Sequence, residues 1–193
     1  MPARHQEFQA GEYYHIYHRG VNRQKIFFET ENYMYFLRLV DKYRQILAMN
    51  VVAYCLMPNH FHFLFQPQKT DNLSDFMHRL QLSYAQALNK RYKRTGPLFD
   101  NRERFQHKHV YSERYQILLC RYIHVNPLKD GLVQRLEDWA FSNYLEFIEA
   151  RQGKLFVPSF REKFFATPAA YAEFVAAYGT EEDKELQAWL NLQ

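Results

Sequence analysis

Hydrophobic and polar positions follow two different periods along the chain, which predict a mixture of helices and strands. From Glu31 to Met49 and from Asn72 to Tyr92, apolar residues recur every three or four positions with charged residues between them, as in amphipathic helices. Short aromatic or apolar runs at Glu12–His18 and Val51–Leu56 predict strands. Met57-Pro58-Asn59 suits a turn into a third strand, because proline and asparagine favour turn conformations.

The middle of the chain completes a recognisable order of elements. Leu98 to Val110 predicts a fourth strand with an irregular start. Ser112 is a suitable N-cap for a helix from Glu113 to about Val125, which Pro127 ends because the residue before a proline avoids helical geometry. The predicted order of strand-helix-strand-strand-helix-strand-helix is typical of an α+β, ferredoxin-like fold, with an antiparallel sheet and helices packed on one face.

Beyond Gly131 the pattern predicts a helical C-terminal extension. Its predicted parts are a helix at Asp138–Ala150, a linker at Val157–Ser159, a helix from Thr167-Pro168 to Tyr178 and a last helix after Thr180. We therefore expect one domain over residues 1–144 and an extension over residues 145–193, whose role the sequence leaves open.

Composition narrows the classes of function. Aromatic residues make up 18% of the 193 residues and the formal net charge is +4, a combination that suits nucleic-acid binding, although most aromatics must fill the core. Cys55 and Cys120 lie in apolar runs and are expected to be buried and reduced. Without a signal-like N-terminus or a run of about 20 apolar residues, the protein is expected to be cytoplasmic and not bound to membranes.

Two histidines one residue apart interrupt the third predicted strand. Because side chains of a strand alternate between its faces, His60 and His62 project together, while Phe61, Phe63 and Phe65 project into the core. Neutral imidazole is a good ligand for divalent cations, so the pair is a candidate metal site. The alternative is a pair of histidines that face solvent or bond to each other.

The helix after the fourth strand adds two further candidates. Tyr122 and Asn126 are four residues apart and therefore lie on one helical face, from which a phenol and an amide oxygen could reach a metal held by the histidines. The alternatives are that Tyr122 belongs to an apolar stripe with Tyr115 and that Asn126 is only a C-cap. Spacing alone does not choose between Tyr115 and Tyr122.

Other residues with chemical potential give weaker signals. A second His-x-His pattern at His107 and His109 is polar throughout and predicts a solvated strand end, and His15, His18 and His124 show no evident partner. Basic residues suited to phosphate are Lys90, Arg91, Lys93 and Arg94, here called the basic cluster, followed by Arg102 and Arg104. Basic residues at a helix C-terminus also suit the helix dipole. The chain has no Walker loop, dinucleotide fingerprint, Gly-x-Ser-x-Gly elbow or zinc-binding cysteine cluster.

Four motifs in a fixed order carry a resemblance to a known family. They are Met57–His62, Gly96–Arg102, Tyr122–Pro127 with Lys129 and Gly131, and Asp138–Tyr144. Over about Glu12 to Tyr144 the chain resembles the single-tyrosine HUH transposases, above all the REP-associated tyrosine transposases. The C-terminal extension has no counterpart in this resemblance.

The resemblance implies a metal-dependent single-stranded DNA endonuclease and strand transferase, as in DNA transposition and recombination. It implies that His60 and His62 hold Mg²⁺ or Mn²⁺, that Asn126 stands where related enzymes place a third ligand, often glutamine, and that Tyr122 attacks the DNA to leave a 5′-phosphotyrosine. The implied partner is single-stranded or hairpin DNA. Some members of the family exchange the tyrosine helix in a homodimer and others are monomers, and the sequence does not distinguish them.

Two rival functions fit the same residues. A non-catalytic DNA- or RNA-binding regulator on the same fold would form no covalent product. A metal-dependent phosphodiesterase that uses water would still cleave after Tyr122→Phe.

Overall fold

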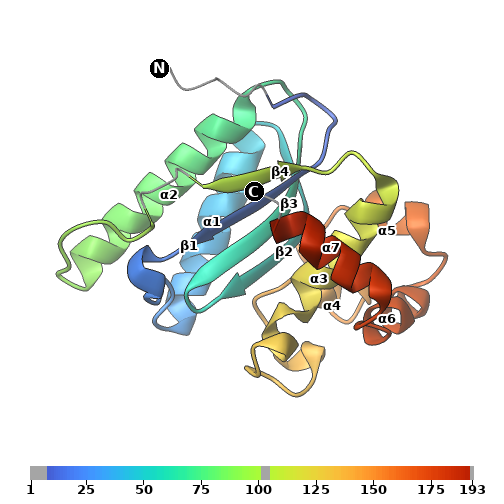
Figure 1. The fold of residues 1–193 in the computed structure, drawn as a ribbon. Helices are drawn as coiled ribbons and strands as arrows, with labels where there is room; N and C mark the ends of the chain where they lie inside the picture. The colour runs from blue at the N-terminus through green and yellow to red at the C-terminus, as the bar shows by residue number, and fades with distance from the viewer. Residues whose placement is uncertain (1–7, 101–104, 192–193) are drawn as a thin grey trace.

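A four-stranded antiparallel sheet organises the structure, a computed structural model that describes residues 8–100 and 105–191. The strands are β1 (Tyr14–Arg19), β2 (Met49–Met57), β3 (His60–Pro67) and β4 (Gln106–His109), in the spatial order β2-β3-β1-β4. The helices are α1 (Thr30–Ile46), α2 (Asn72–Arg91), α3 (Glu113–Lys129), α4 (Tyr144–Phe147), α5 (Pro158–Phe164), α6 (Pro168–Ala176) and α7 (Glu181–Asn191). Short 3-10 turns lie at Val21–Arg23 (η1) and Leu136–Asp138 (η2). The predicted α+β, ferredoxin-like fold with a helical C-terminal region is confirmed (Figure 1).

Helices cover both faces of the sheet (Figure 1). The expected packing on one face holds for α1 and α2, whereas α3 packs on the opposite face against Val52 and Leu64 through Leu119 and Ile123. The reason lies in β2, where eight of nine residues are buried on alternating faces. A strand that is apolar on both sides needs a partner on both sides.

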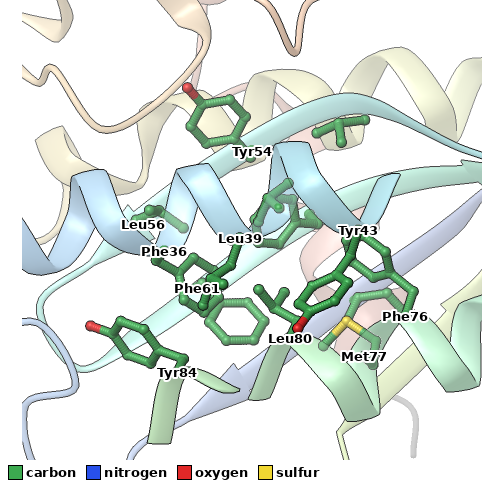
Figure 2. Close-up of a cluster of buried hydrophobic side chains, with 14 of the residues drawn as sticks. Phe36, Leu39, Tyr43, Tyr54, Leu56, Phe61, Phe76, Met77, Leu80 and Tyr84 are labelled. Atoms are coloured by element: carbon green, nitrogen blue, oxygen red, sulfur yellow. The ribbon is translucent and has the colours of Figure 1, made fainter. Parts of the chain in front are cut away.

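The core between the sheet and helices α1 and α2 is built from aromatic rings (Figure 2). Phe61 on β3 is fully buried, and its ring centroid lies 5.3 Å from that of Phe36 on α1. Tyr84 on α2 meets Phe36 edge to face at 4.8 Å and donates its hydroxyl to the Ile26 carbonyl at 2.7 Å. The predicted core face of β3 is therefore correct, and His60 and His62 project from the opposite face.

The segment from Asp138 to Tyr144 covers the free edge of β2. The Leu56 amide donates to the Phe141 carbonyl at 2.9 Å, and the Asn143 side chain accepts from the Tyr54 amide at 2.7 Å and donates to the Val52 carbonyl at 2.9 Å. The predicted helix over Asp138–Ala150 is wrong, since only Tyr144–Phe147 forms an α-helix. Bonding to a strand edge satisfies the backbone in place of helical bonds.

Helix α3 continues through Pro127 to Lys129, so the expected stop before this proline is wrong. Proline lacks the N–H that would bond to the carbonyl four residues earlier, which belongs to Ile123. The side-chain nitrogen of Asn126 lies 3.4 Å from the Ile123 oxygen and 2.7 Å from the Tyr122 oxygen. These contacts replace the missing donor and allow the helix to proceed.

Two further expectations differ from the structure. Regular strand geometry in Leu98–Val110 is confined to Gln106–His109, with an isolated bridge from Phe99 to Gly20, and residues 101–104 are outside the described part. The predicted linker Val157–Ser159 instead opens helix α5, in which Pro158 takes a first-turn position that needs no N–H donor. The start of α6 is as predicted, with the Thr167 hydroxyl accepting from the Ala170 amide at 3.1 Å.

The C-terminal extension packs against α3. Tyr171 and Val175 of α6 belong to the same buried cluster as Leu119 and Ile123 of α3, and α7 also contacts α3. Both cysteines, Cys55 and Cys120, are buried and free. Within the described residues, no helix has the length and hydropathy to cross a bilayer. The division at residue 144 stays a prediction.

Candidate active site

A pocket of about 380 Å³ lies where β1, β3, β4, α3 and α7 meet. It brings together all four residues predicted for chemistry: His60, His62, Tyr122 and Asn126. It is also lined by His15, Tyr17, Gln106, His107, Lys108, Lys129, Asp130, Gln187, Leu190 and Asn191. Elements distant in sequence therefore build one site from a single chain.

Each histidine of the predicted pair uses one ring nitrogen for a partner in the protein. Nδ1 of His60 lies 2.6 Å from Asn59 Oδ1, and because this oxygen only accepts, Nδ1 carries the proton. Nδ1 of His62 lies 3.0 Å from Nε2 of His15. When His62 donates in this bond, Nε2 of both His60 and His62 is the nitrogen with a lone pair. Such secondary bonds fix the tautomer and orientation of ligand histidines.

His15 is a site residue that sequence reasoning missed. Its ring stacks on that of His62, with centroids 5.3 Å apart and planes 6° from parallel. The expectation that His15 has no partner is wrong, and the alternation along β1 was the available signal, because it places His15 and Tyr17 on one face. Tyr17 pairs with His62 across β1 and β3, and this register brings His15 close to His62. A single sequence does not reveal the register between two strands.

Burial keeps the imidazoles neutral. It lowers the pKa of His60 from 6.5 to about 4 and that of His15 to about 3, and it places the pKa of His62 well below the ordinary value. At neutral pH all three rings are therefore uncharged. The neutral ring is the form that binds a metal cation.

Asn126 presents an oxygen to the site. Its amide nitrogen donates to the Tyr122 and Ile123 carbonyls of its own helix, which fixes the flip of the amide, because carbonyl oxygens only accept. The remaining atom, Oδ1, is a potential ligand. Asn126 is buried, and the C-cap of α3 is Asp130, so the alternative that Asn126 is only a C-cap is wrong.

The donor atoms of these residues suit a divalent cation that accepts both nitrogen and oxygen. Two neutral imidazoles and one amide oxygen match Mn²⁺ better than Mg²⁺, which prefers oxygen ligands. Across residues 8–100 and 105–191, no group of three or more His, Cys, Asp or Glu side chains has the arrangement of a metal site. Asn126 is therefore a candidate for a third ligand of a type that this search does not include.

Tyr122 lies beside the histidines, and Tyr115 does not. The Tyr122 ring meets the His62 ring edge to face, with centroids 5.5 Å apart, and Lys129 Nζ is 4.9 Å from the Tyr122 ring centre. Burial raises the pKa of Tyr122 to about 12. Tyr115 does not line the pocket and packs at 5.0 Å against Trp189. The structure thus separates two tyrosines that helical spacing leaves equivalent.

The basic residues predicted to bind DNA do not line this pocket. The basic cluster lies at the C-terminal end of α2, with Arg91 paired to Glu29 at 2.5 Å and Arg94 5.7 Å above the Phe28 ring. Arg102 and Arg104 fall outside the described residues. Contact of these residues with DNA stays a prediction.

Three other histidines, His18, His109 and His124, also have partners. His18 accepts from Gln81 at 2.6 Å and donates to the Asp100 carbonyl at 2.8 Å, while His124 is fully buried between Tyr171 and Asn143. His109 is 40% exposed and bonds to Glu12 at 2.8 Å, in agreement with a solvated strand end. The expectation that His18 and His124 lack partners is wrong, because those partners come from distant segments.

Comparisons with known proteins identify the family of the chain and match its fold. The sequence model of one family, described as transposase IS200 like, matches residues 9–128. A Haemophilus influenzae protein named as a REP-associated tyrosine transposase is 27% identical over 110 residues, which are 51% of this chain and 61% of that protein. The chain thus spans less than two thirds of that relative.

A solved structure adds a match in fold. It shows a REP-associated tyrosine transposase bound to a REP hairpin, and it covers 81% of this chain and 94% of its own chain with a TM-score of 0.65. The sequence identity is 18%, so this match concerns the fold alone.

Proposed function

Because the chain belongs to the IS200-like transposase family, we propose that it is a metal-dependent single-stranded DNA endonuclease and strand transferase with Tyr122 as nucleophile. The observation that carries the proposal is the pocket that unites Tyr122 with His60, His62 and Asn126. The four residues come from a strand and a helix on the same face of the sheet. In this arrangement Tyr122 can act as the nucleophile while the other three residues hold a cation that binds the phosphate.

The proposed reaction exchanges one phosphodiester for another. The Tyr122 oxygen forms a bond to phosphorus, the bond from phosphorus to the 3′ oxygen breaks, and the proton lost by the phenol is balanced by the proton gained by the 3′ hydroxyl. The 5′ phosphate stays on the tyrosine. Attack by another 3′ hydroxyl reverses the step, and the covalent bond conserves the energy for strand transfer.

Residues of the pocket support this chemistry. His60 and His62 would hold a divalent cation through their Nε2 atoms, with Asn126 Oδ1 as third ligand, and a bound cation supplies positive charge at the scissile phosphate. Lys129, 4.9 Å from the Tyr122 ring centre, places a further positive charge where the DNA backbone would enter. Both charges favour the phenolate form of Tyr122, which burial opposes.

Hairpin DNA with a single-stranded flank is the proposed substrate. The structural neighbour was solved with a REP hairpin, and the basic cluster on α2 offers a second region for phosphates. Contacts to the phosphate backbone do not distinguish between bases, so the basic cluster would position the DNA strand without selecting its sequence.

The test is capture of the covalent intermediate. A hairpin DNA labelled at its 3′ end is incubated with the protein and Mn²⁺, and we expect the label to migrate with the protein in denaturing gels. Tyr122→Phe should abolish the adduct and the cleavage while it retains DNA affinity, whereas Tyr115→Phe, the matched control on the same helix, should retain all three. Removal of one hydroxyl hardly changes volume, so both variants should fold.

Each rival predicts a different result. Cleavage without any adduct, unaffected by Tyr122→Phe, would identify a nuclease that uses water. DNA binding with neither cleavage nor adduct would identify a non-catalytic regulator. An adduct mapped by mass spectrometry to a peptide without Tyr122 would refute the assignment of the nucleophile.

A further inference from the structure

A second pocket, of about 790 Å³, lies on the face of the sheet opposite the candidate active site. It is bounded by α2, by the end of β1 and by the segments on either side of residues 101–104. Pro97, Leu98 and Phe99, which belong to the second of the four motifs, line it together with Leu82 of α2. The function proposed above gives no task to this motif or to this pocket.

We propose that this pocket, here called the rear pocket, binds an unpaired nucleobase of the same DNA strand that enters the candidate active site. The inference rests on the proposed function for the identity of the substrate, to which it adds a second binding site. Four features support it: the position of the pocket, the charge of its lining, its ring side chains and an amide with unused bonding capacity.

The two pockets lie back to back at one end of the sheet. On β1, Tyr17 lines the candidate active site and the next residue, His18, lines the rear pocket. Gln106 and Phe105 divide in the same way at the start of β4, since consecutive residues of an extended chain project to opposite faces. β4 has four residues and forms the edge of the sheet (Figure 1). A DNA strand therefore has only this short edge strand to pass between the two pockets.

The charge of the lining distinguishes the rear pocket from a phosphate site. Lys108 and Lys129 line the candidate active site, whereas the described residues that line the rear pocket include no lysine or arginine. Asp75, which does line it, accepts from Arg79 Nε through both carboxylate oxygens at 2.8 and 2.9 Å. A phosphate would find no counterion there, but an uncharged base would need none. The phosphates can instead contact the basic cluster at the end of the same helix.

Ring side chains give the rear pocket a surface on which a base can stack. The Phe99 ring lies parallel to the His18 ring, with centroids 5.2 Å apart and planes 15° from parallel. Phe105 is only partly buried, and Leu82 is 47% exposed. Single-strand binding proteins use aromatic rings in this way, because every base has a flat face that stacks. A bound base would cover apolar surface that otherwise faces solvent.

Gln81 adds hydrogen-bonding groups for the edge of a base. The Asp100 carbonyl only accepts, so His18 Nε2 donates to it at 2.8 Å and His18 Nδ1 accepts from Gln81 Nε2 at 2.6 Å. This bond uses one hydrogen of the Gln81 amide. Within the described residues, its second hydrogen and its oxygen have no hydrogen-bond partner. An adjacent donor and acceptor match the donor and acceptor pattern of base edges.

The experiment measures dissociation constants for a hairpin DNA whose single-stranded flank has been selected for binding from a randomised pool. Each flank base is then removed in turn, which leaves an abasic site with its phosphates intact. We expect one position at which the abasic site weakens binding roughly fivefold or more, as the loss of one stacked base predicts. The salt dependence of binding should not change at that position, because no charge has been removed.

Two variants of the full-length chain connect this position to the rear pocket. Leu82→Ala removes an exposed apolar contact, and Ala85→Phe fills the pocket with a ring. Each should weaken binding of the intact DNA roughly threefold or more. Neither should weaken binding of the DNA that is abasic at the sensitive position, because the contact is already absent from that DNA.

Two matched controls make the same changes outside the rear pocket. Ile46→Ala truncates a side chain that is 59% exposed on α1, and Gln86→Phe adds a ring at an exposed position of α2. Neither residue lines the rear pocket or the candidate active site. Both control variants should bind the intact and the abasic DNA as the unaltered protein does.

Three results would overturn the inference. They are a flank without a base-sensitive position, an abasic penalty that persists in full in Leu82→Ala and Ala85→Phe, and an equal loss of affinity for intact and abasic DNA in these variants. Adduct formation is measured separately on the same DNA. Coupling between base and pocket without an adduct would refute the proposed reaction alone, and an adduct without this coupling would refute the rear pocket alone.

Discussion

Breaking the ion pair between Arg121 and Asp183 should destabilise the protein strongly, because both side chains are buried. Their side chains are 2% and 5% exposed, and the Asp183 carboxylate also accepts three bonds at the start of α7. Asp183→Ala removes all of these and leaves a guanidinium without a counterion in the interior. Removal of one partner of a buried pair costs about 3 to 5 kcal/mol.

The structure places the expected loss near the lower end of this range. Arg121 would keep its bond to the Phe174 carbonyl at 3.1 Å and its position 4.3 Å from the Phe174 ring centre, which partly compensate the cation. We therefore expect Asp183→Ala to lower the free energy of unfolding by about 3 kcal/mol, measured by urea denaturation at neutral pH.

An exposed pair on the same helices provides the control for this prediction. Arg114 and Glu185 are bonded at 3.0 Å, but their side chains are 52% and 57% exposed. Glu185→Ala should therefore cost less than about 1 kcal/mol. If Asp183→Ala were as mild as this control, the buried ion pair would not be what attaches α7 to α3, and this reasoning would be refuted.

Three further predictions concern the core, the histidines and the basic surface. Phe61→Ala should cost about 3 to 5 kcal/mol in denaturant unfolding, whereas His60→Gln, at the half-buried pocket rim, should abolish Mn²⁺-dependent cleavage with little loss of stability; the reverse pattern would invert the faces of β3. Burial lowers the pKa of His124 from 6.5 to about 4, so between these two pH values His124 binds a proton only in the unfolded chain. Lowering the pH from 7 to 5 should therefore reduce the free energy of unfolding by about 2 kcal/mol through His124. Between pH 7 and pH 5, in metal-free buffer, His124→Gln should lose about 2 kcal/mol less stability than the unaltered protein, because only the contribution of His124 is removed while those of His15, His60 and His62 remain. Charge reversal of the basic cluster should weaken hairpin binding and flatten its dependence on salt, and an unchanged salt slope would remove the cluster from the interface.

The local pattern of the sequence predicted most of the sheet and its two helices correctly. Alternation along β3 separates Phe61 from His60 and His62, and helical spacing places Tyr122 and Asn126 on one face, both as the structure has them. These inferences need only the periods of a strand and a helix. They do not depend on how distant segments meet.

The features that the sequence did not predict depend on tertiary contacts between distant segments. His15 joins the site only through the register between β1 and β3, and Gln187 only through the packing of α7 on α3. The segment before Tyr144 has a helical pattern, but bonds to the edge of β2 satisfy its backbone instead. In this segment, tertiary hydrogen bonds override the local preference for a helix, and the local sequence does not predict these bonds.

The Asn126-Pro127 pair shows how a break in a local rule can serve the site. A proline at this position removes the N–H donor for the Ile123 carbonyl. The side-chain nitrogen of Asn126 donates to the Tyr122 and Ile123 carbonyls instead. Oδ1 is then the side-chain atom that makes no bond to the helix backbone, and Asn126 lines the pocket that also contains His60 and His62. An alanine in place of Pro127 would return the N–H to the helix and free the amide to rotate. The proline that was expected to end the helix therefore has a different consequence, because it orients the third candidate ligand one turn after Tyr122.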